Sequence, residues 1–426
     1  MLPSFSRSFL SSLVLVLIVG CGGGGSAANG NGGGGDNSTT VTFTFKVGTP
    51  TAVAARIGSG AFTAQTLNAG ALSLSIPSGT ATFALAWVCV PAGSGSVQQT
   101  EQFVFDLSLA DGTSFTPACA PNAPSPQTGT FTGSVDASAI PGTAYLNVFA
   151  ENSESILPDY MSGAVSSFSF AAPAGSDRVE VLALNNANTV VAARDFTNQA
   201  VPGALNNGNT VVLGAADQVV PEPITYNNVP SGYLTPITFV AFDTNGAGGF
   251  QLSSAATTQY PAMPAGAVES GDSYSFFAVA NNSAGNGEGV AAALTSTTGG
   301  PVSFTFPAPW VYAGPTPAAL PTLDFAYAGF SGKTGVVQAA DLNWTTGSRV
   351  AVYSEMIATS SYQNGSTTLA FPDLSAVSGF PAPPSSGTSV TWLAQIVQSS
   401  YGVLQPSPSG GTSASTVQNG GTFNVP

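Results

Sequence analysis

The sequence predicts an all-β protein made of tandem β-sandwich modules. Apolar residues alternate with a period of two, and no segment shows a sustained helical period. A turn made of an aliphatic residue, a proline and, in most copies, a glycine precedes a strand-like segment at six places. These turns recur about every 90 residues, which suits a sandwich of about 100 residues. A β-propeller is the alternative architecture, because several short strands per unit would also build one.

The N-terminus has the features of a secretion signal. Arg7 supplies a positive charge, and residues 9–19 form an apolar stretch that two serines interrupt. This stretch is shorter than the about 20 residues that span a bilayer. No later apolar run is long, so we expect no other membrane-spanning segment.

The signal ends in Ile18-Val19-Gly20-Cys21, which resembles the lipobox of bacterial lipoproteins at every position. The resemblance implies cleavage before Cys21, a diacylglycerol thioether on its sulfur and an acylated amine, with palmitate-type chains anchoring the protein stably. The alternative is an ordinary secretion signal with a chance cysteine. Gly22 is not the aspartate associated with inner-membrane retention, so the resemblance favours the outer membrane of the cell envelope.

Residues 22–35 contain nine glycines, which predicts a flexible tether between the anchor and the folded part. The expected organisation is a signal peptide over 1–20, a lipidated cysteine and tether over 21–40, and four modules. The modules are placed at 41–140, 141–229, 230–320 and 321–426, the last with a C-terminal tail.

Two segments show the strand pattern most clearly. In residues 81–90, one face carries Phe83, Leu85, Trp87 and Cys89. In residues 236–243 both faces are apolar, which predicts a central strand covered on both sides.

The recurring turn sets the module length. Proline ends one strand because it cannot donate a ladder hydrogen bond, and glycine supplies a positive φ. Pro141, Pro230 and Pro321 are 89 and 91 residues apart, and Pro173 and Pro264 are 91 apart. The six segments begin at Ile76, Ile140, Ala172, Val229, Met263 and, in a weaker copy without glycine, Leu320.

The segments "VPSGYLTPITFVAFD" and "ESGDSYSFFAVAN" occur in this order, as do "APAGSDRVEVLAL" and "NNGNTVVLGAADQ". They resemble the immunoglobulin-like or prealbumin-like β-sandwich repeats of bacterial envelope lipoproteins. The resemblance is best over residues 165–290. It implies a fold more than a function.

Composition excludes several functions. Charged residues make up 7% of the chain and apolar residues 43%, so a neutral polar surface of Ser, Thr, Asn, Gln and Gly is expected. The seven basic residues are scattered among 21 acidic ones, which argues against nucleic acid as a partner. The chain has no histidine, so Ser-His-Asp and Cys-His nucleophile systems and histidine metal sites are excluded. We expect no cofactor and no metal.

Cys89 and Cys119 remain once Cys21 is lipidated. An even pair in an oxidising compartment predicts one disulfide, and closing this loop would stabilise the fold by about 3–4 kcal/mol. Two free buried thiols are the alternative.

Three loops are candidate ligand-binding sites. "GFSGKTG" (329–335) lacks the glycine of a phosphate-binding loop, so we expect a hairpin turn with a solvated Lys333. "DTNGAGG" (243–249) lacks the final glutamate of a calcium loop and fits a tight hairpin better. Glu151, Glu154 and Asp159 lie in another loop, where solvated carboxylates are commoner than a calcium site.

The four tryptophans are candidates for sugar stacking or for the core. Trp87 and Trp392 lie inside alternating segments and are expected in the core. Trp310 and Trp344 lie near turns and are the candidate ligand-facing aromatics, although packing in the core or at an edge is favoured even there.

These observations favour a lipid-anchored, non-enzymatic envelope or surface protein with a structural or display role. Its partners would be the membrane, through the anchor, and an envelope protein or a glycan. A carbohydrate- or peptide-binding module is the second hypothesis and would need a groove lined by Trp310 and Trp344. A glycoside hydrolase with two carboxylates is the third.

Overall fold

The computed structural model describes residues 38–45, 48–90, 98–119, 129–150, 161–172, 175–244, 249–285, 287–346, 350–400 and 412–426. In this part of the chain almost every regular element is a strand, which confirms the all-β prediction. The exceptions are a one-turn helix and five 3₁₀ turns: α2 (Ser360–Gln363), η1 (Leu109–Asp111), η2 (Leu205–Gly208), η3 (Ala215–Asp217), η4 (Ala265–Ala267) and η5 (Ala328–Phe330).

A twelve-stranded sheet, called the main sheet below, runs through most of the molecule. Neighbouring strands are antiparallel, except that β25 and β6 are parallel. In spatial order the strands are β18 (Gly249–Ala255), β17 (Ile237–Asp243), β20 (Ser273–Asn281), β21 (Gly289–Ser296), β28 (Ser413–Asn424), β27 (Ser389–Ser399), β24 (Val336–Thr346), β25 (Val350–Thr359), β6 (Gln98–Ser108), β5 (Thr82–Cys89), β2 (Ala52–Ile57) and β3 (Thr63–Ala64).

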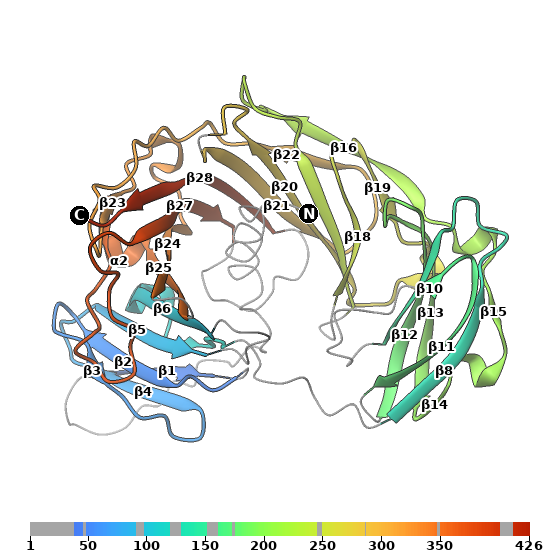
Figure 1. The fold of residues 1–426 in the computed structure, drawn as a ribbon, viewed down its shortest axis with the longest axis horizontal. Helices are drawn as coiled ribbons and strands as arrows, with labels where there is room; N and C mark the ends of the chain where they lie inside the picture. Colours follow the sequence, from blue (N-terminus) through green and yellow to red (C-terminus); the bar gives the residue numbers. More distant parts are fainter. Residues whose placement is uncertain are drawn as a thin grey trace.

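The main sheet joins parts of the chain that are far apart in sequence. β6 pairs with β25 over residues 98–106 and 350–358, and β21 pairs with β28. Strands from the predicted modules at 41–140, 230–320 and 321–426 therefore share one hydrogen-bonded ladder. Figure 1 shows this sheet curving as an arch, with β2 and β5 near one end and β18 near the other. The module boundaries themselves stay a prediction.

A small sheet packs against β2, β5 and β6 to form a sandwich. It consists of β4 (Ala71–Ile76), β1 (Thr39–Thr44) and β7 (Ser114–Phe115). The core between the layers holds the face predicted for residues 81–90, including Phe83 and Trp87. Trp87 stacks on Phe103 with ring centroids 5.1 Å apart. The alternation therefore predicted this strand and its inward face correctly.

The disulfide lies at the edge of this core. Cys89, at the end of β5, is bonded to Cys119, with a Cα–Cα distance of 5.5 Å and a sequence separation of 30 residues. Both side chains are buried. The predicted disulfide is confirmed, and the alternative of two free thiols is not realised.

The strands from β8 to β15 form a second sandwich with its own core. One layer contains β10 (Met161–Ser162), β9 (Tyr145–Ala150), β12 (Gly175–Leu184) and β13 (Val190–Val201). The other contains β11 (Val165–Ala172), β8 (Gly129–Asp136), β14 (Gly203–Ala204) and β15 (Val211–Val212). β8 precedes the predicted boundary at residue 141, but its strand partners all follow that boundary. In Figure 1 these strands lie at one end of the arch, and β1 to β5 lie at the opposite end.

The largest core lies on the other face of the main sheet. Two small sheets and long loop segments cover it: β19 (Gln259–Ala262), β16 (Val220–Asn227) and β22 (Val302–Thr305) in one sheet, and β23 (Thr322–Asp324) with β26 (Thr368–Ala370) in the other. The described strands thus form packed layers. The propeller alternative is wrong for this part of the chain, because its strands do not form radially repeated blades.

One strand departs from its prediction. β17 was expected to be covered on both faces, but only Thr238, Val240 and Phe242 are fully buried, and Ile237 is 40% exposed. The covering layer lies on one side only, and β17 is the second strand from the sheet edge.

The recurring turns do lead into strands. Gly79, Gly142 and Gly232 have φ values of +85°, +79° and +82°, in the region that favours glycine. They precede β5, β9 and β17. The physical reading of the proline–glycine turn therefore holds at these places. No helix in the described ranges has the length and apolar character needed to cross a membrane.

Candidate functional site

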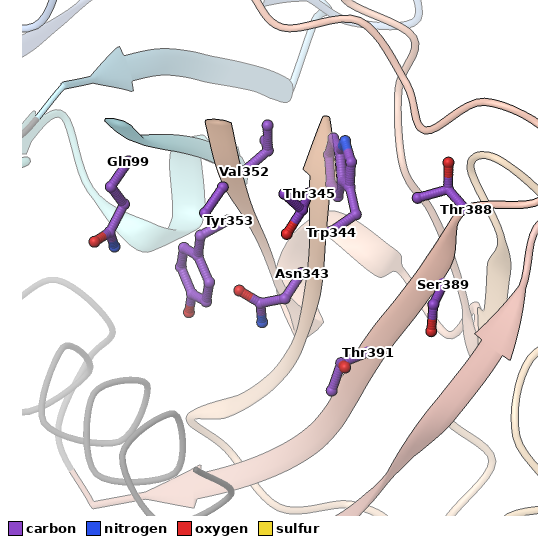
Figure 2. A pocket seen from close by; sticks show the side chains of 10 residues that line it. Gln99, Asn343, Trp344, Thr345, Val352, Tyr353, Thr388, Ser389 and Thr391 are labelled. Atoms are coloured by element: carbon purple, nitrogen blue, oxygen red, sulfur yellow. The ribbon is translucent and has the colours of Figure 1, made fainter. Parts of the chain in front are cut away.

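A polar recess opens at the main sheet where β6, β25, β24 and β27 lie side by side (Figure 2). Its volume of about 470 Å³ falls within the range of about 300–1,000 Å³ typical of small-molecule sites. We call it the polar recess. It is lined by Gln99, Asn343, Trp344, Thr345, Ala351, Val352, Tyr353, Thr388, Ser389 and Thr391.

Strand register brings the polar lining together. Asn343 of β24 pairs with Tyr353 of β25 on one side and with Thr391 of β27 on the other. Directly paired residues point to the same face, with Cβ atoms about 4.5–5.5 Å apart. Figure 2 shows Tyr353 and Asn343 side by side, between Gln99 and Thr391. Three strands thus place amide and hydroxyl groups in one row, and Gln99 of β6 lies one step away from it, opposite Ala351.

Two of these groups can take up a ligand, the Asn343 amide and the Thr391 hydroxyl. Asn343, Tyr353 and Thr391 are half-buried. Among the described residues, no hydrogen bond engages the Asn343 amide or the Thr391 hydroxyl. At the rim, the Gln99 amide donates to a Glu101 carboxylate oxygen at 2.9 Å. The row can therefore donate to and accept from a ligand.

Two buried carboxyl groups lie one step farther along the same strands. Asp341 and Glu355 are paired across β24 and β25 and are 3% and 1% exposed. Burial raises the pKa of Glu355 well above its usual range, and the charge of Asp341 raises it further. The Tyr353 hydroxyl donates to Glu355 in a long hydrogen bond of 3.4 Å. Neither carboxyl belongs to the recess lining, so the pair does not provide the two accessible carboxylates that glycoside hydrolysis needs.

The two candidate ligand-facing tryptophans are both buried. Trp310 is 2% exposed, stacks on Tyr312 at 4.9 Å, and donates from Nε1 to the Ala326 carbonyl. Trp310 therefore packs in the core, as the favoured interpretation predicted, because the loop that carries it covers the main sheet. Trp344 is 5% exposed, and its side chain belongs to the core on the face of β24 opposite Asn343. It borders the recess, and its Nε1 has no hydrogen-bond partner. Neither tryptophan therefore presents its ring to a ligand.

The other tryptophans are in the core as predicted. Trp87 is 1% exposed, and Trp392 is 7% exposed with Tyr312 packed edge-on against it.

A second polar feature is structural. Arg178 of β12 is bonded to three carboxylates, and we call this group the Arg178 cluster. Its guanidinium donates to both Asp272 oxygens at 2.7 and 2.9 Å, to Asp195 at 2.9 Å and to Glu180 at 2.9 Å. All four side chains are at most 6% exposed. The cluster links β12 to the turn before β20, and so joins the second sandwich to the main sheet.

The Arg178 cluster has more acids than its one cation can balance. Burial raises the pKa of Glu180 to about 8, and the nearby Asp195 charge adds to the increase. One oxygen of Glu180, Oε2, is buried without a hydrogen-bond partner. The raised pKa favours the protonated form of Glu180 at neutral pH.

Arg56 makes a smaller link within the first sandwich. It donates to Asp106 at 2.6 Å and to the Tyr362 hydroxyl at 2.7 Å, and its guanidinium lies 4.7 Å from the Phe62 ring centroid. Burial raises the pKa of Asp106 to about 6, against the lowering effect of Arg56.

The three predicted loop sites have different outcomes. Lys333 is exposed as expected, but its turn joins η5 to β24 and is not a hairpin. Phe242 pairs with Phe250, which confirms the hairpin around 243–249, although residues 245–248 lie outside the described residues. Cys21 and the acidic loop at 151–159 also lie outside them. Within the described ranges, no group of three or more acidic or cysteine side chains could hold a metal ion.

Sequence reasoning missed both the polar recess and the Arg178 cluster. The signal available was alternation in "VVQAADLNWTT", where Asp341, Asn343 and Thr345 share a face. Alternation gives the face of each strand but not the strands beside it, so the row across β25, β24 and β27 was not predictable.

Comparisons with known proteins assign no family. No family model matches the chain, and no curated protein matches it. Among solved structures, the chain is similar to the Bacillus anthracis TIE protein at 11% identity, over 63% of this chain and 50% of that one, with a TM-score of 0.14. The matched region thus spans about half the length of that protein.

Proposed function

We propose that this chain is a non-catalytic, lipid-anchored envelope protein that displays one rigid β-body. Cys21 would carry the acyl chains, and the glycine-rich segment would keep the body clear of the membrane. We place it at the outer membrane rather than the inner one, with no nucleic-acid partner.

The observation that carries this proposal is the main sheet. Modules that fold separately are expected to move relative to one another unless a large interface joins them. Here, the parallel pairing of β6 with β25 ties an early segment to a late one through a backbone ladder. The Arg178 cluster then fixes the second sandwich to the same body. Such a body suits display at a fixed distance and orientation.

A second candidate function is ligand binding by the displayed body. The polar recess favours it, because amide and hydroxyl groups from four strands meet there beside an aromatic ring. The buried Asp341 and Glu355 do not favour the hydrolase hypothesis, since neither lines the recess.

Protease shaving of intact cells tests the display proposal. We expect mass spectrometry to find peptides from 41–426 in the released fraction and a lipid-modified Cys21 peptide in the membrane. The Cys21→Ser variant is the control, and we expect it to leave the membrane fraction. An unmodified peptide that spans the cleavage region in the mature protein would disprove the anchor. Release only after the envelope is broken would disprove outward display.

A further inference from the structure

The lining of the polar recess mixes uncharged polar side chains with apolar ones and includes no charged residue. Its side chains contribute amides from Gln99 and Asn343 and hydroxyls from Thr345, Ser389 and Thr391. Each of these groups can donate and accept. We propose that the polar recess binds a neutral oligosaccharide. The Asn343 amide and the Thr391 hydroxyl would hydrogen-bond its hydroxyl groups, and the Tyr353 ring would pack against a sugar face.

The charge around the recess sets the ligand class. No cation lines it, whereas Glu101 lies at its rim, paired with Tyr353 across β6 and β25. Asp341 and Glu355 lie one step farther along the same strands, outside the lining. An anionic ligand such as a phosphate ester or a uronic acid would meet the Glu101 carboxyl at the rim and no counter-ion in the lining. A neutral, hydroxyl-rich ligand needs no counter-ion and can hydrogen-bond the amide and hydroxyl groups of the lining.

The backbone argues against a peptide at the same place. Extended peptides usually bind by adding a strand to a free sheet edge. Here, β25, β24 and β27 are interior strands, each hydrogen-bonded on both sides. Only side chains are available to a ligand, and they form the kind of amide, hydroxyl and aromatic set that recognises sugar hydroxyls and ring faces.

The inference rests on the proposed display body but not on its anchor, so the two fail separately. The test uses the full chain purified in a polyoxyethylene detergent, because glucoside detergents would compete. The probes are maltotriose, cellotriose, chitotriose and mannotriose, with trigalacturonate as the anionic counterpart. Binding is measured by calorimetry and by tryptophan fluorescence up to about 10 mM ligand.

We expect at least one neutral trisaccharide to bind and trigalacturonate not to bind. Asn343→Ala and Thr391→Ala should each weaken binding about tenfold, with no matching fall in melting temperature. Gln251→Ala is the matched control, because it removes an exposed amide from the distant strand β18 and should leave affinity unchanged. The inference is overturned if no neutral probe binds, if trigalacturonate binds as well as they do, or if the recess variants bind like the control.

Discussion

Two junctions hold this molecule together, and they are built differently. Between β6 and β25 the joint is a backbone ladder nine residue pairs long, from Gln98 with Val350 to Asp106 with Ala358. Between the second sandwich and the main sheet the joint combines the Arg178 cluster with apolar packing, in which Leu182 and Leu184 of β12 and Val190 and Ala193 of β13 belong to the largest core. One joint is a row of equivalent backbone bonds, and the other combines apolar packing with a few buried charges.

The difference predicts how each joint responds to change. A ladder hydrogen bond uses main-chain groups, which no substitution except proline removes. A buried cluster with three carboxylates and one cation depends on every member, because removing one leaves an uncompensated buried charge. The ladder joint should therefore tolerate side-chain changes and pH, whereas the Arg178 joint should not.

The largest effect is expected from Arg178→Met. This change leaves Asp195, Glu180 and Asp272 buried without their shared cation and should lower the free energy of unfolding by about 3–5 kcal/mol. Urea denaturation at pH 7 measures it. Arg194→Met on the neighbouring strand β13 is the control. Its side chain is 34% exposed and pairs with one carboxylate, that of Asp217, so a smaller loss than for Arg178→Met is expected. Equal losses in the two variants would remove the contrast between the joints.

Removing the disulfide should have the next largest effect. The Cys89→Ala/Cys119→Ala variant lacks the cross-link between two residues that are 30 apart in sequence. We expect its free energy of unfolding to be about 3–4 kcal/mol lower. The measurement compares urea midpoints with and without reductant: reductant should lower the midpoint of the wild type and leave the variant unchanged. If the variant had the same urea midpoint as the oxidised wild type, packing around Trp87 alone would stabilise the first sandwich.

The pH dependence of the free energy of unfolding also distinguishes the two joints, because Glu180 belongs to the Arg178 cluster. The pKa of Glu180 is raised to about 8 in the folded protein, above the value of an unfolded glutamate. The folded state therefore binds the extra proton, and stability is lost as pH rises from the unfolded value through about 8. Between pH 5 and pH 7 we expect this group to contribute a fall of about 2 kcal/mol.

The Glu180→Gln variant tests this effect, because glutamine does not titrate. Urea denaturation from pH 5 to pH 8 should show a shallower fall in stability than in the wild type. Asp106 and Glu355 also have raised pKa values, and they supply a background slope that both proteins share. Parallel curves for the two proteins would show that Glu180 is ionised in the Arg178 cluster at pH 7.

The smallest effect is expected at the ladder joint. Gln102 of β6 donates to the Ser354 hydroxyl of β25 at 3.0 Å, and both side chains are buried. Ser354→Ala removes this bond and should cost about 1 kcal/mol. The measurement is the melting temperature of Ser354→Ala, compared with those of the wild type and of Arg178→Met. A loss as large as that of Arg178→Met would mean that the ladder joint also depends on single side chains.

Local features of the fold were predictable from the sequence. Phe83, Leu85 and Trp87 alternate in a segment bounded by turn residues, so the inward face of β5 followed directly. The proline–glycine turns predicted where β9 and β17 begin, because the residue types themselves constrain the backbone. Cys89 and Cys119 were the only pair left to bond once Cys21 was assigned to the anchor.

Long-range pairing was not predictable in the same way. Gln102 and Ser354 are 252 residues apart, and Arg178 and Asp272 are 94 apart. A single sequence gives the face of a strand but not the strand beside it, so the main sheet and its polar recess required coordinates. Trp310 shows the same limit, because it packs not only on Tyr312 of its own segment but also on Phe325, which directly follows β23.

The parallel pairing of β6 with β25 also sets an order of events during biosynthesis. β6 is made early, and one of its two hydrogen-bonding edges has no partner until residues 350–358 have been synthesised. During that interval the nascent chain exposes a strand edge that can pair with other chains. Contacts this distant in sequence also slow folding. The same ladder that stiffens the finished body therefore makes its unfinished form dependent on protection from aggregation.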